Sequence, residues 1–324
     1  MIAAGVALGL AAALCQSASY FFSRLFVLRK GGGGLRLLVL GHLLMGLMSL
    51  AILAAWRPAI PRTGAFVAPL LSTALFYLSG QACLFYALRH VEASRASPLL
   101  GLKILVLAAI TVLAFRQRLT GLQWLAAGLA VAAAFLLNRL GRTLPGRALA
   151  GILLACVTYS LSDLSIVRLV PAVAEGHGAF AATLLAVTLS YVICGLVALI
   201  LWPWAGRATA DEWRYAMPFA VSWLAAMLFL FACFAQIGAV MGNVVQSTRG
   251  LMTVAIGAVL AHYGIGRGAA GASAADGSAA PPAPAEVEAL AAIALEPKVD
   301  RRLLARRLAA AALMSAAVAL FFLG

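Results

Sequence analysis

Apolar runs of about twenty residues follow one another along the chain, separated by short polar connections. A helix of that length crosses a bilayer core of about 30 Å, and repeated runs of this kind are typical of polytopic membrane proteins. The pattern therefore predicts an all-α polytopic membrane protein with ten transmembrane helices. These helices are expected at residues 2–23, 35–56, 66–88, 96–115, 121–139, 148–168, 179–203, 216–236, 241–263 and 303–323.

One connection is much longer than the others. Residues 264–302, between the ninth and tenth predicted helices, are rich in Ala, Gly, Ser and Pro. This composition predicts a mostly disordered insertion, within which residues 286–295 could form a short surface helix. A tolerated loop is favoured over a regulatory segment.

The composition supports a membrane location. Hydrophobic residues make up 64% and charged residues 10% of the 324 positions, too few charges to cover a soluble protein of this size. The net charge of +14 would suggest a nucleic-acid partner for a soluble protein, but most basic residues flank the predicted helices, where they set topology. No nucleic-acid partner is expected. Residues 2–23 are expected to be a mature span, because no Lys or Arg precedes Arg24.

Two predicted helices carry a cation near the middle, Lys103 in 96–115 and Arg249 in 241–263. Each central cation costs about 2.5–3.5 kcal/mol on insertion scales. The cost of two is a large fraction of the free energy of unfolding of an ordinary protein. Structural pairing with an acid or a carbonyl is one interpretation, and an anion site formed by both cations is the other. An offset of 146 residues aligns the two helices: Lys103 with Arg249, Leu105 with Leu251, Ala109 with Ala255 and Ile110 with Ile256.

A second offset, of 139 residues, relates the first and sixth predicted helices. The two offsets differ by only seven residues, so one duplication explains both. Five spans per half is an odd number, so the second copy enters the membrane inverted, as in transporters that bind substrate near the midplane between repeats. We expect two inverted five-helix repeats, at residues 1–140 and 147–324. The second offset aligns Tyr20 with Tyr159, Ser23 with Ser162 and Arg29 with Arg168, and it places Arg24 opposite Asp163.

Residues 96–103 read A-S-P-L-L-G-L-K and, after an apolar stretch, residues 118–124 read R-L-T-G-L-Q-W. This order resembles the helix 4–5 signature of EamA-like proteins of the drug/metabolite transporter superfamily, in which Arg36 also matches a common position. Gln117 stands where family members usually have Glu, and the neighbourhood of Lys103 lacks the Pro that many carry. The resemblance implies a ten-helix transporter with cytoplasmic termini. By analogy with phosphate-sugar and nucleotide-sugar carriers, it also implies substrate-binding cations in helices 4 and 9.

The ninth predicted helix is the most polar span. Its Asn243, Gln246, Arg249 and Thr253 form one stripe at helical spacing, which in a bilayer must face protein or a water-filled cavity. Cavity lining is favoured over helix packing because the stripe contains an arginine. The further substrate-binding candidates, each of which could instead be a packing residue, are Tyr20, Tyr77, Gln81 and Tyr159, with Gln16 as another polar residue of the first helix.

Asp163 is the only acid well inside a predicted span. It is either a proton-coupling group or a static partner of Arg24, Lys103 or Arg249. His42 could titrate, although a lone His inside a span is more often a hydrogen-bonded core residue.

Enzyme and pump chemistry is not indicated. The four histidines form no H-E-x-x-H motif, the chain contains neither G-x-S-x-G nor a P-loop, and the five cysteines lie in apolar runs without C-x-x-C spacing. No catalytic residue, metal site or cofactor is expected.

The favoured function is secondary transport of a small organic anion by alternating access, in a bacterial cytoplasmic membrane, with the protein a monomer or a homodimer. An exporter of amino acids or hydrophobic drugs is the alternative among transporters. A non-transporting scaffold or lipid-binding membrane protein is the alternative from another class, and it predicts central polar groups that are fully paired.

The basic residues also predict an orientation. Odd-numbered connections and the adjoining helix ends hold 17 Lys and Arg residues, and even-numbered ones hold five. The positive-inside rule therefore places the odd-numbered connections in the cytoplasm and both termini outside, whereas the family resemblance implies cytoplasmic termini.

Overall fold

The computed structural model describes residues 2–30, 34–88, 99–115 and 145–249, together with single positions outside these ranges. Within them the chain is helical, without a strand. The elements are α1 (Ile2–Lys30), α2 (Gly34–Trp56), η1 (Gly64–Phe66), α3 (Val67–Leu88), η2 (Leu100–Leu102), α5 (Lys103–Phe115), α7 (Gly146–Ala172), α8 (Ala179–Ala205) and α9 (Ala210–Ser247).

Six of the described helices are long and apolar enough to cross a membrane. They are α1, α2, α3 with the preceding 3₁₀ turn, α7, α8 and α9, and they coincide with predicted spans. Over the described residues the predicted all-helical membrane architecture is therefore confirmed. The count of ten helices and the two-repeat division stay predictions, because most of 121–139, 250–263 and 303–323 and all of the insertion at 264–302 lie outside the described residues.

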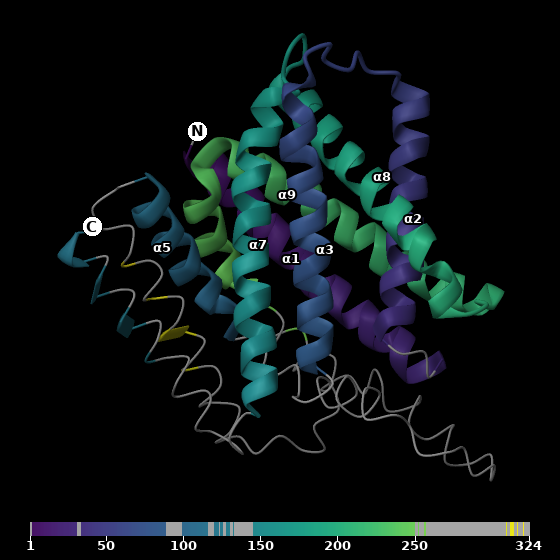
Figure 1. Ribbon diagram of the computed structural model, residues 1–324, viewed down its shortest axis with the longest axis horizontal. Coiled ribbons are helices and arrows are strands. Elements are labelled where there is room, and N and C mark those ends of the chain that lie inside the picture. Colours follow the sequence, from purple (N-terminus) through teal and green to yellow (C-terminus); the bar gives the residue numbers. More distant parts are fainter. Residues whose placement is uncertain are drawn as a thin grey trace.

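The six helices alternate in direction, and contacts between their connections show it. At one end, Arg36 at the start of α2 forms an ion pair with Glu212 at the start of α9, with 3.1 Å between Nε and Oε1. At the other end, His177 Nε2 is hydrogen-bonded at 2.8 Å to the carbonyl oxygen of Ala59. Figure 1 shows this second contact region at the top, where the connections that follow α2 and α7 meet. Each end thus joins a connection from the first half to one from the second.

Helix α9 contains a break near its end. Gly238 has φ 76° and ψ 167°, a combination that is essentially restricted to glycine. The break falls in the connection predicted between the spans at 216–236 and 241–263. The stripe of polar residues that includes Asn243 therefore follows the break and has its own helical axis.

Both central cations directly follow a tight turn of the backbone. The 3₁₀ turn η2 ends at Leu102, and Lys103 is the first residue of α5. In the second half, α9 ends at Ser247, and the Thr248 N–H donates to the Val245 carbonyl oxygen at 3.1 Å, an i to i−3 bond, just before Arg249. Short 3₁₀ segments within a helical stretch often mark functional hinges.

The helices pair across the two halves. α1 packs along α9, α3 along α7, and α2 along α8; α3 and α7 run side by side in the middle of Figure 1. The α2–α8 contact is centred on Gly46 and Gly195. A Cβ atom added to either residue would lie 2.8 Å from the Cα atom of the other. Small residues permit this backbone approach between membrane helices.

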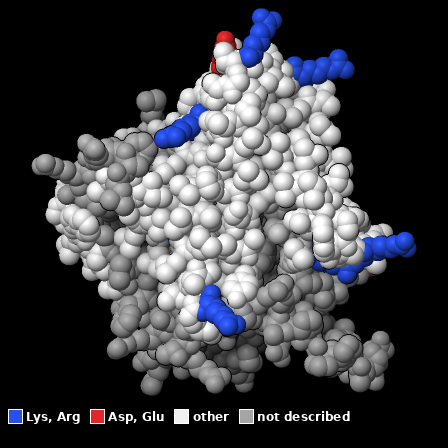
Figure 2. All heavy atoms as spheres, in the orientation of Figure 1, with Lys and Arg blue, Asp and Glu red and all other residues white. Residues whose placement is uncertain are grey.

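The outer surface is largely apolar. Leu47 on α2 is 65% exposed, Leu75 on α3 is 52% exposed and Ile200 on α8 is 67% exposed. In Figure 2 the middle of the visible face is uncharged, and the Lys and Arg side chains in view lie mainly toward its margins. An apolar surface of this extent is expected where acyl chains surround the protein.

Candidate functional site

An ion pair joins α5 to α7 in the interior. Lys103 Nζ lies 2.5 Å from Asp163 Oδ2, and the two side chains are 18% and 7% exposed. Asn243 on α9 donates to the same carboxylate oxygen at 2.6 Å and to the carbonyl oxygen of Ala239 at 2.8 Å. Three helices thus meet at one carboxylate. Of the partners that the sequence left open for Asp163, Lys103 forms an ion pair with it; the side chain of Arg24 lies outside the described residues.

The second cation is held by neutral groups of α1. Arg249 Nη1 donates to Gln16 Oε1 at 2.6 Å, and the guanidinium carbon lies 5.5 Å from the centroid of the Tyr20 ring. Ser17 Oγ donates to the backbone carbonyl of Arg249 at 3.3 Å. An arginine over the face of an aromatic ring is stabilised by the ring quadrupole, so α1 supports this positive charge without cancelling it.

The two cations have matching surroundings. Lys103 Nζ lies 5.7 Å from the centroid of the Tyr159 ring, and Ser160 Oγ donates to the Lys103 carbonyl oxygen at 3.2 Å. Arg249 has the corresponding contacts with Tyr20 and a serine of α1. The sequence offsets align the cations with each other and the tyrosines with each other. These paired contacts are the arrangement expected of two repeats related by a twofold axis.

Aromatic rings connect the two cations. From Tyr20, which lies under Arg249, ring contacts lead to Trp223 at 6.1 Å, on to Tyr77 at 6.3 Å, and on to Tyr159 at 6.4 Å, which lies under Lys103. These rings come from α1, α9, α3 and α7. The two cations therefore bound one interior region rather than two separate ones.

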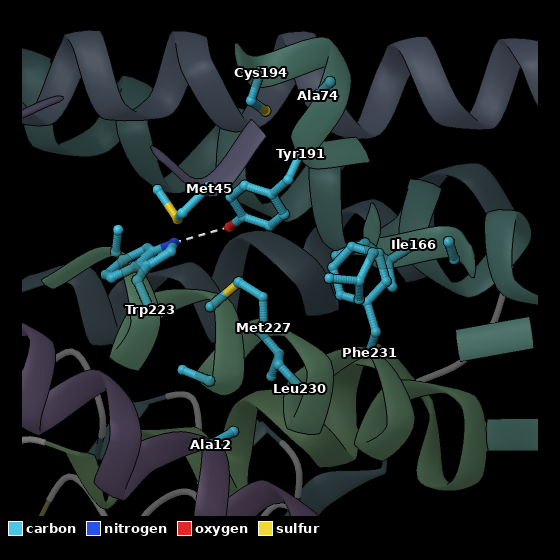
Figure 3. Packing of buried hydrophobic residues seen from close by; sticks show 14 of the residues in the cluster. Ala12, Met45, Ala74, Ile166, Tyr191, Cys194, Trp223, Met227, Leu230 and Phe231 are labelled. Carbon is cyan, nitrogen blue, oxygen red and sulfur yellow. Dashed lines mark hydrogen bonds between the residues drawn. The ribbon is translucent and has the colours of Figure 1, made fainter. Parts of the chain in front are cut away.

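Hydrogen bonds hold this aromatic cluster in place. Trp223 Nε1 donates to the Tyr191 hydroxyl at 2.8 Å, which Figure 3 shows among the surrounding apolar side chains. Gln81 Nε2 donates to the Tyr77 hydroxyl at 3.1 Å, and His42 Nε2 is hydrogen-bonded to the same hydroxyl at 3.1 Å. Because the hydroxyl, indole, amide and imidazole groups of these side chains are hydrogen-bonded to each other, each ring is held in one position.

Gln246 is the exception to this pairing. It lies between Asn243 and Arg249 on the same stripe and is 7% exposed, yet neither its Nε2 nor its Oε1 has a hydrogen-bond partner within the described structure. A buried amide without a partner costs about 1–3 kcal/mol. Such a group in a folded protein calls for an explanation, and a bound ligand or water supplies one.

The structure brings most of the predicted site residues together. Gln81 takes part only through the Tyr77 hydroxyl, and Thr253 lies outside the described residues. Tyr191 was not predicted, because a single tyrosine in the apolar α8 carries no periodic signal. Within the described ranges, no three His, Cys, Asp or Glu side chains gather in a way that could hold a metal ion. The predicted residues that contact another site residue are Lys103, Asp163, Asn243, Arg249, Tyr20, Tyr77 and Tyr159.

These helices and buried charges define an integral membrane protein with several helical spans. The model of the EamA-like transporter family matches residues 3–139. Over these residues, which are fewer than half of the chain, the match confirms the resemblance to EamA-like transporters.

Among solved structures, one titled "Crystal structure of protein" is similar over 91% of this chain and 97% of its own, with a TM-score of 0.58 and 16% sequence identity. At that identity the likeness concerns the fold. No curated protein matches the chain.

Proposed function

We propose that this protein is a secondary transporter that moves a small organic anion across the membrane by alternating access. The family match supports transport of a small molecule. The observation that supports an anionic substrate is the pair of interior cations, of which Lys103 has an acidic partner and Arg249 is held by Gln16 and the Tyr20 ring.

The cost of the buried charges favours a functional role. A buried ion pair can often be replaced by apolar residues without loss of stability, so stability alone is weak grounds for keeping one. Ionisable groups within membrane spans more often mark substrate or ion pathways. The unpartnered amide of Gln246, one turn before Arg249, adds a donor and an acceptor that a substrate could satisfy.

Anion binding could change the helix arrangement through Asp163. A substrate carboxylate or phosphate that binds the cations competes with Asp163 for Lys103, and thereby loosens the contact between α5 and α7. A ligand shifts a conformational equilibrium by its differential affinity for the two states. The tight turns directly before both cations, and the cross-half contacts at each end of the molecule, are the places where such a shift would be absorbed.

Transport by purified protein in proteoliposomes tests the proposal. Uptake is measured for labelled monocarboxylates, dicarboxylates and phosphate monoesters. Arg249→Gln should reduce uptake of the transported anion by about thirtyfold or more, since loss of a buried charged partner typically costs 2–5 kcal/mol. Arg168→Gln, which alters an exposed arginine of α7, is the matched control and should transport normally. Wild-type transport by Arg249→Gln would refute the anion site.

The Lys103–Asp163 pair also favours one alternative substrate class. A cation and an acid 2.5 Å apart beside aromatic rings could receive the carboxylate and the ammonium group of an amino acid. An amino-acid substrate would lose uptake equally in Lys103→Gln and Asp163→Asn. A monovalent anion should instead depend mainly on Arg249.

A further inference from the structure

We propose that Gln246 is a substrate-binding residue, and that the transported anion carries a neutral hydroxyl or carboxamide group that binds to it. This inference rests on the proposed function and names the class of anion. Gln246 is 7% exposed, and neither its Nε2 nor its Oε1 has a hydrogen-bond partner within the described structure. A primary amide both donates and accepts hydrogen bonds, so its complement is a neutral group that does the same.

The neighbours of Gln246 fix the direction in which its side chain points. Asn243 donates to a carboxylate of α7, Val244 packs with a buried isoleucine of α5, and Val245 lies against a glycine of α1. Successive side chains of a helix are about 100° apart, so the next position points between α1 and α7. These two helices carry the tyrosine rings that lie under the two cations. The amide therefore faces the interior region that the cations bound.

Gln246 differs from the other buried amide side chains that the structure describes. Gln16, Gln81 and Asn243 each have a hydrogen bond to another side chain. Buried side-chain amides in folded proteins are mostly hydrogen-bonded, because an unpaired amide costs free energy that an apolar side chain of the same length avoids. A ligand that pairs with the amide accounts for its presence at this position.

The position of Gln246 on its helix suits an anion that has a second, neutral group. Arg249 follows three residues later, so the two side chains are neighbours along one helix face. Both residues come after the break at Gly238, so one short helical segment positions them. A carboxylate or phosphate that binds to the guanidinium group can therefore place a hydroxyl or carboxamide substituent against the amide.

Matched anions test the inference by isothermal titration of the full-length protein in nanodiscs at pH 7.5. The pairs are lactate with propionate, malate with succinate, glycerol phosphate with propyl phosphate, and succinamate with levulinate, whose ketone accepts but does not donate. Both members of a pair carry the same charge, so the charged groups of the site contribute equally to both. Wild-type protein should bind the hydroxyl or carboxamide member of the best-bound pair at least about tenfold more tightly, because the other member leaves the amide unpaired.

A substitution of Gln246 then separates a binding role from a structural one. Gln246→Met, which is similar in size but has no amide, should lose the preference within each pair. Gln236→Met, the same change at an exposed glutamine of α9, is the matched control and should retain it. Ligand-free Gln246→Met should unfold at the wild-type temperature or above it, since no hydrogen bond within the protein is lost. A purely structural glutamine would give a lower melting temperature.

The outcomes separate the two proposals. Equal binding within every pair by wild-type protein overturns the role of Gln246 and leaves the anion-transport proposal standing. A preference that persists in Gln246→Met also overturns that role, and so does a variant that melts below wild type or does not fold. If wild-type protein binds no member of any pair, the anion-transport proposal fails, and this inference fails with it.

Discussion

At the scale of single residues, the two cations are alike in sequence position but different in chemistry. Lys103 is balanced by a buried carboxylate that also accepts from Asn243. Arg249 donates to the Gln16 amide oxygen and lies over the Tyr20 ring. Removing one member of a buried ion pair leaves an uncompensated charge, and removing Arg249 takes away the donor to the Gln16 amide oxygen. The same type of substitution should therefore have unequal effects on stability.

We expect Lys103→Gln to destabilise the protein more than Arg249→Gln does. Loss of one partner of a buried pair typically costs 3–5 kcal/mol, and loss of a charged hydrogen bond to an amide about 1.5–3 kcal/mol. Thermal unfolding of the detergent-solubilised variants measures the difference. The double variant Lys103→Gln/Asp163→Asn should recover part of the loss, because no charge is then left unpaired. Equal melting temperatures for the two single variants would contradict the assigned partners.

At the scale of helices, the contact between α2 and α8 depends on two glycines that face each other. Neither Gly46 nor Gly195 has room for a Cβ atom, because the opposite Cα would then lie 2.8 Å away. Backbone carbonyl groups also line both positions. A Cβ atom on Gly46 would contact the Tyr191 carbonyl oxygen, and a Cβ atom on Gly195 would contact the His42 carbonyl oxygen. His42 and Tyr191 stack on each other beside it, with ring centroids 6.3 Å apart. Backbone separation here consequently sets the positions of His42 and Tyr191, which are hydrogen-bonded to Tyr77 and Trp223.

We expect Gly46→Ala to push α2 and α8 apart and to lower stability by about 1–3 kcal/mol, the usual cost of overpacking. Gly146→Ala is the control, because Gly146 opens α7 and has no atom within 4 Å of an added Cβ. Thermal unfolding compares the two variants, and transport measures whether the shift reaches the site. A stable, fully active Gly46→Ala would show that the close approach is not required.

At the scale of the whole molecule, the cross-half contacts at the two ends match the alternation of helix directions. Arg36 and Glu212 meet at the end that holds the odd-numbered connections, and Ala59 and His177 meet at the other end. Glu212 also completes a capping box with Thr209 at the start of α9, so one carboxylate serves both the helix terminus and the contact between halves. These contacts show which connections lie at the same end of the protein. Which end faces the cytoplasm is a separate question.

Reporter fusions determine which end faces the cytoplasm. From the excess of Lys and Arg, we expect a cytoplasm-active reporter to work after residue 207 and to be silent after residue 60. The same rule predicts a silent reporter at Gly324. The opposite result at all three sites would favour the orientation that the EamA resemblance implies. Equal activity after residues 60 and 207 would contradict the alternation itself.

The sequence by itself was enough to predict the membrane class and the positions of the described spans, and it singled out Lys103 and Arg249 as site candidates. The reason is that a bilayer restricts helix length, and a cation inside a span is costly enough to stand out from its neighbours. The sequence offsets also paired Tyr20 with Tyr159 and the cations with each other, as the predicted internal duplication would. The lengths of apolar runs, the cations within them and the offsets between them can all be read from positions along the sequence.

Only the tertiary structure decided which groups meet. Arg24, Lys103 and Arg249 were all possible partners for Asp163, and contact across helices, not spacing within one, pairs it with Lys103. The structure also placed Tyr191 beside Trp223 and left the Gln246 amide without a partner among the described residues. Helix packing brings together residues far apart in the chain, and the rotation of each helix about its axis decides which of its faces they share.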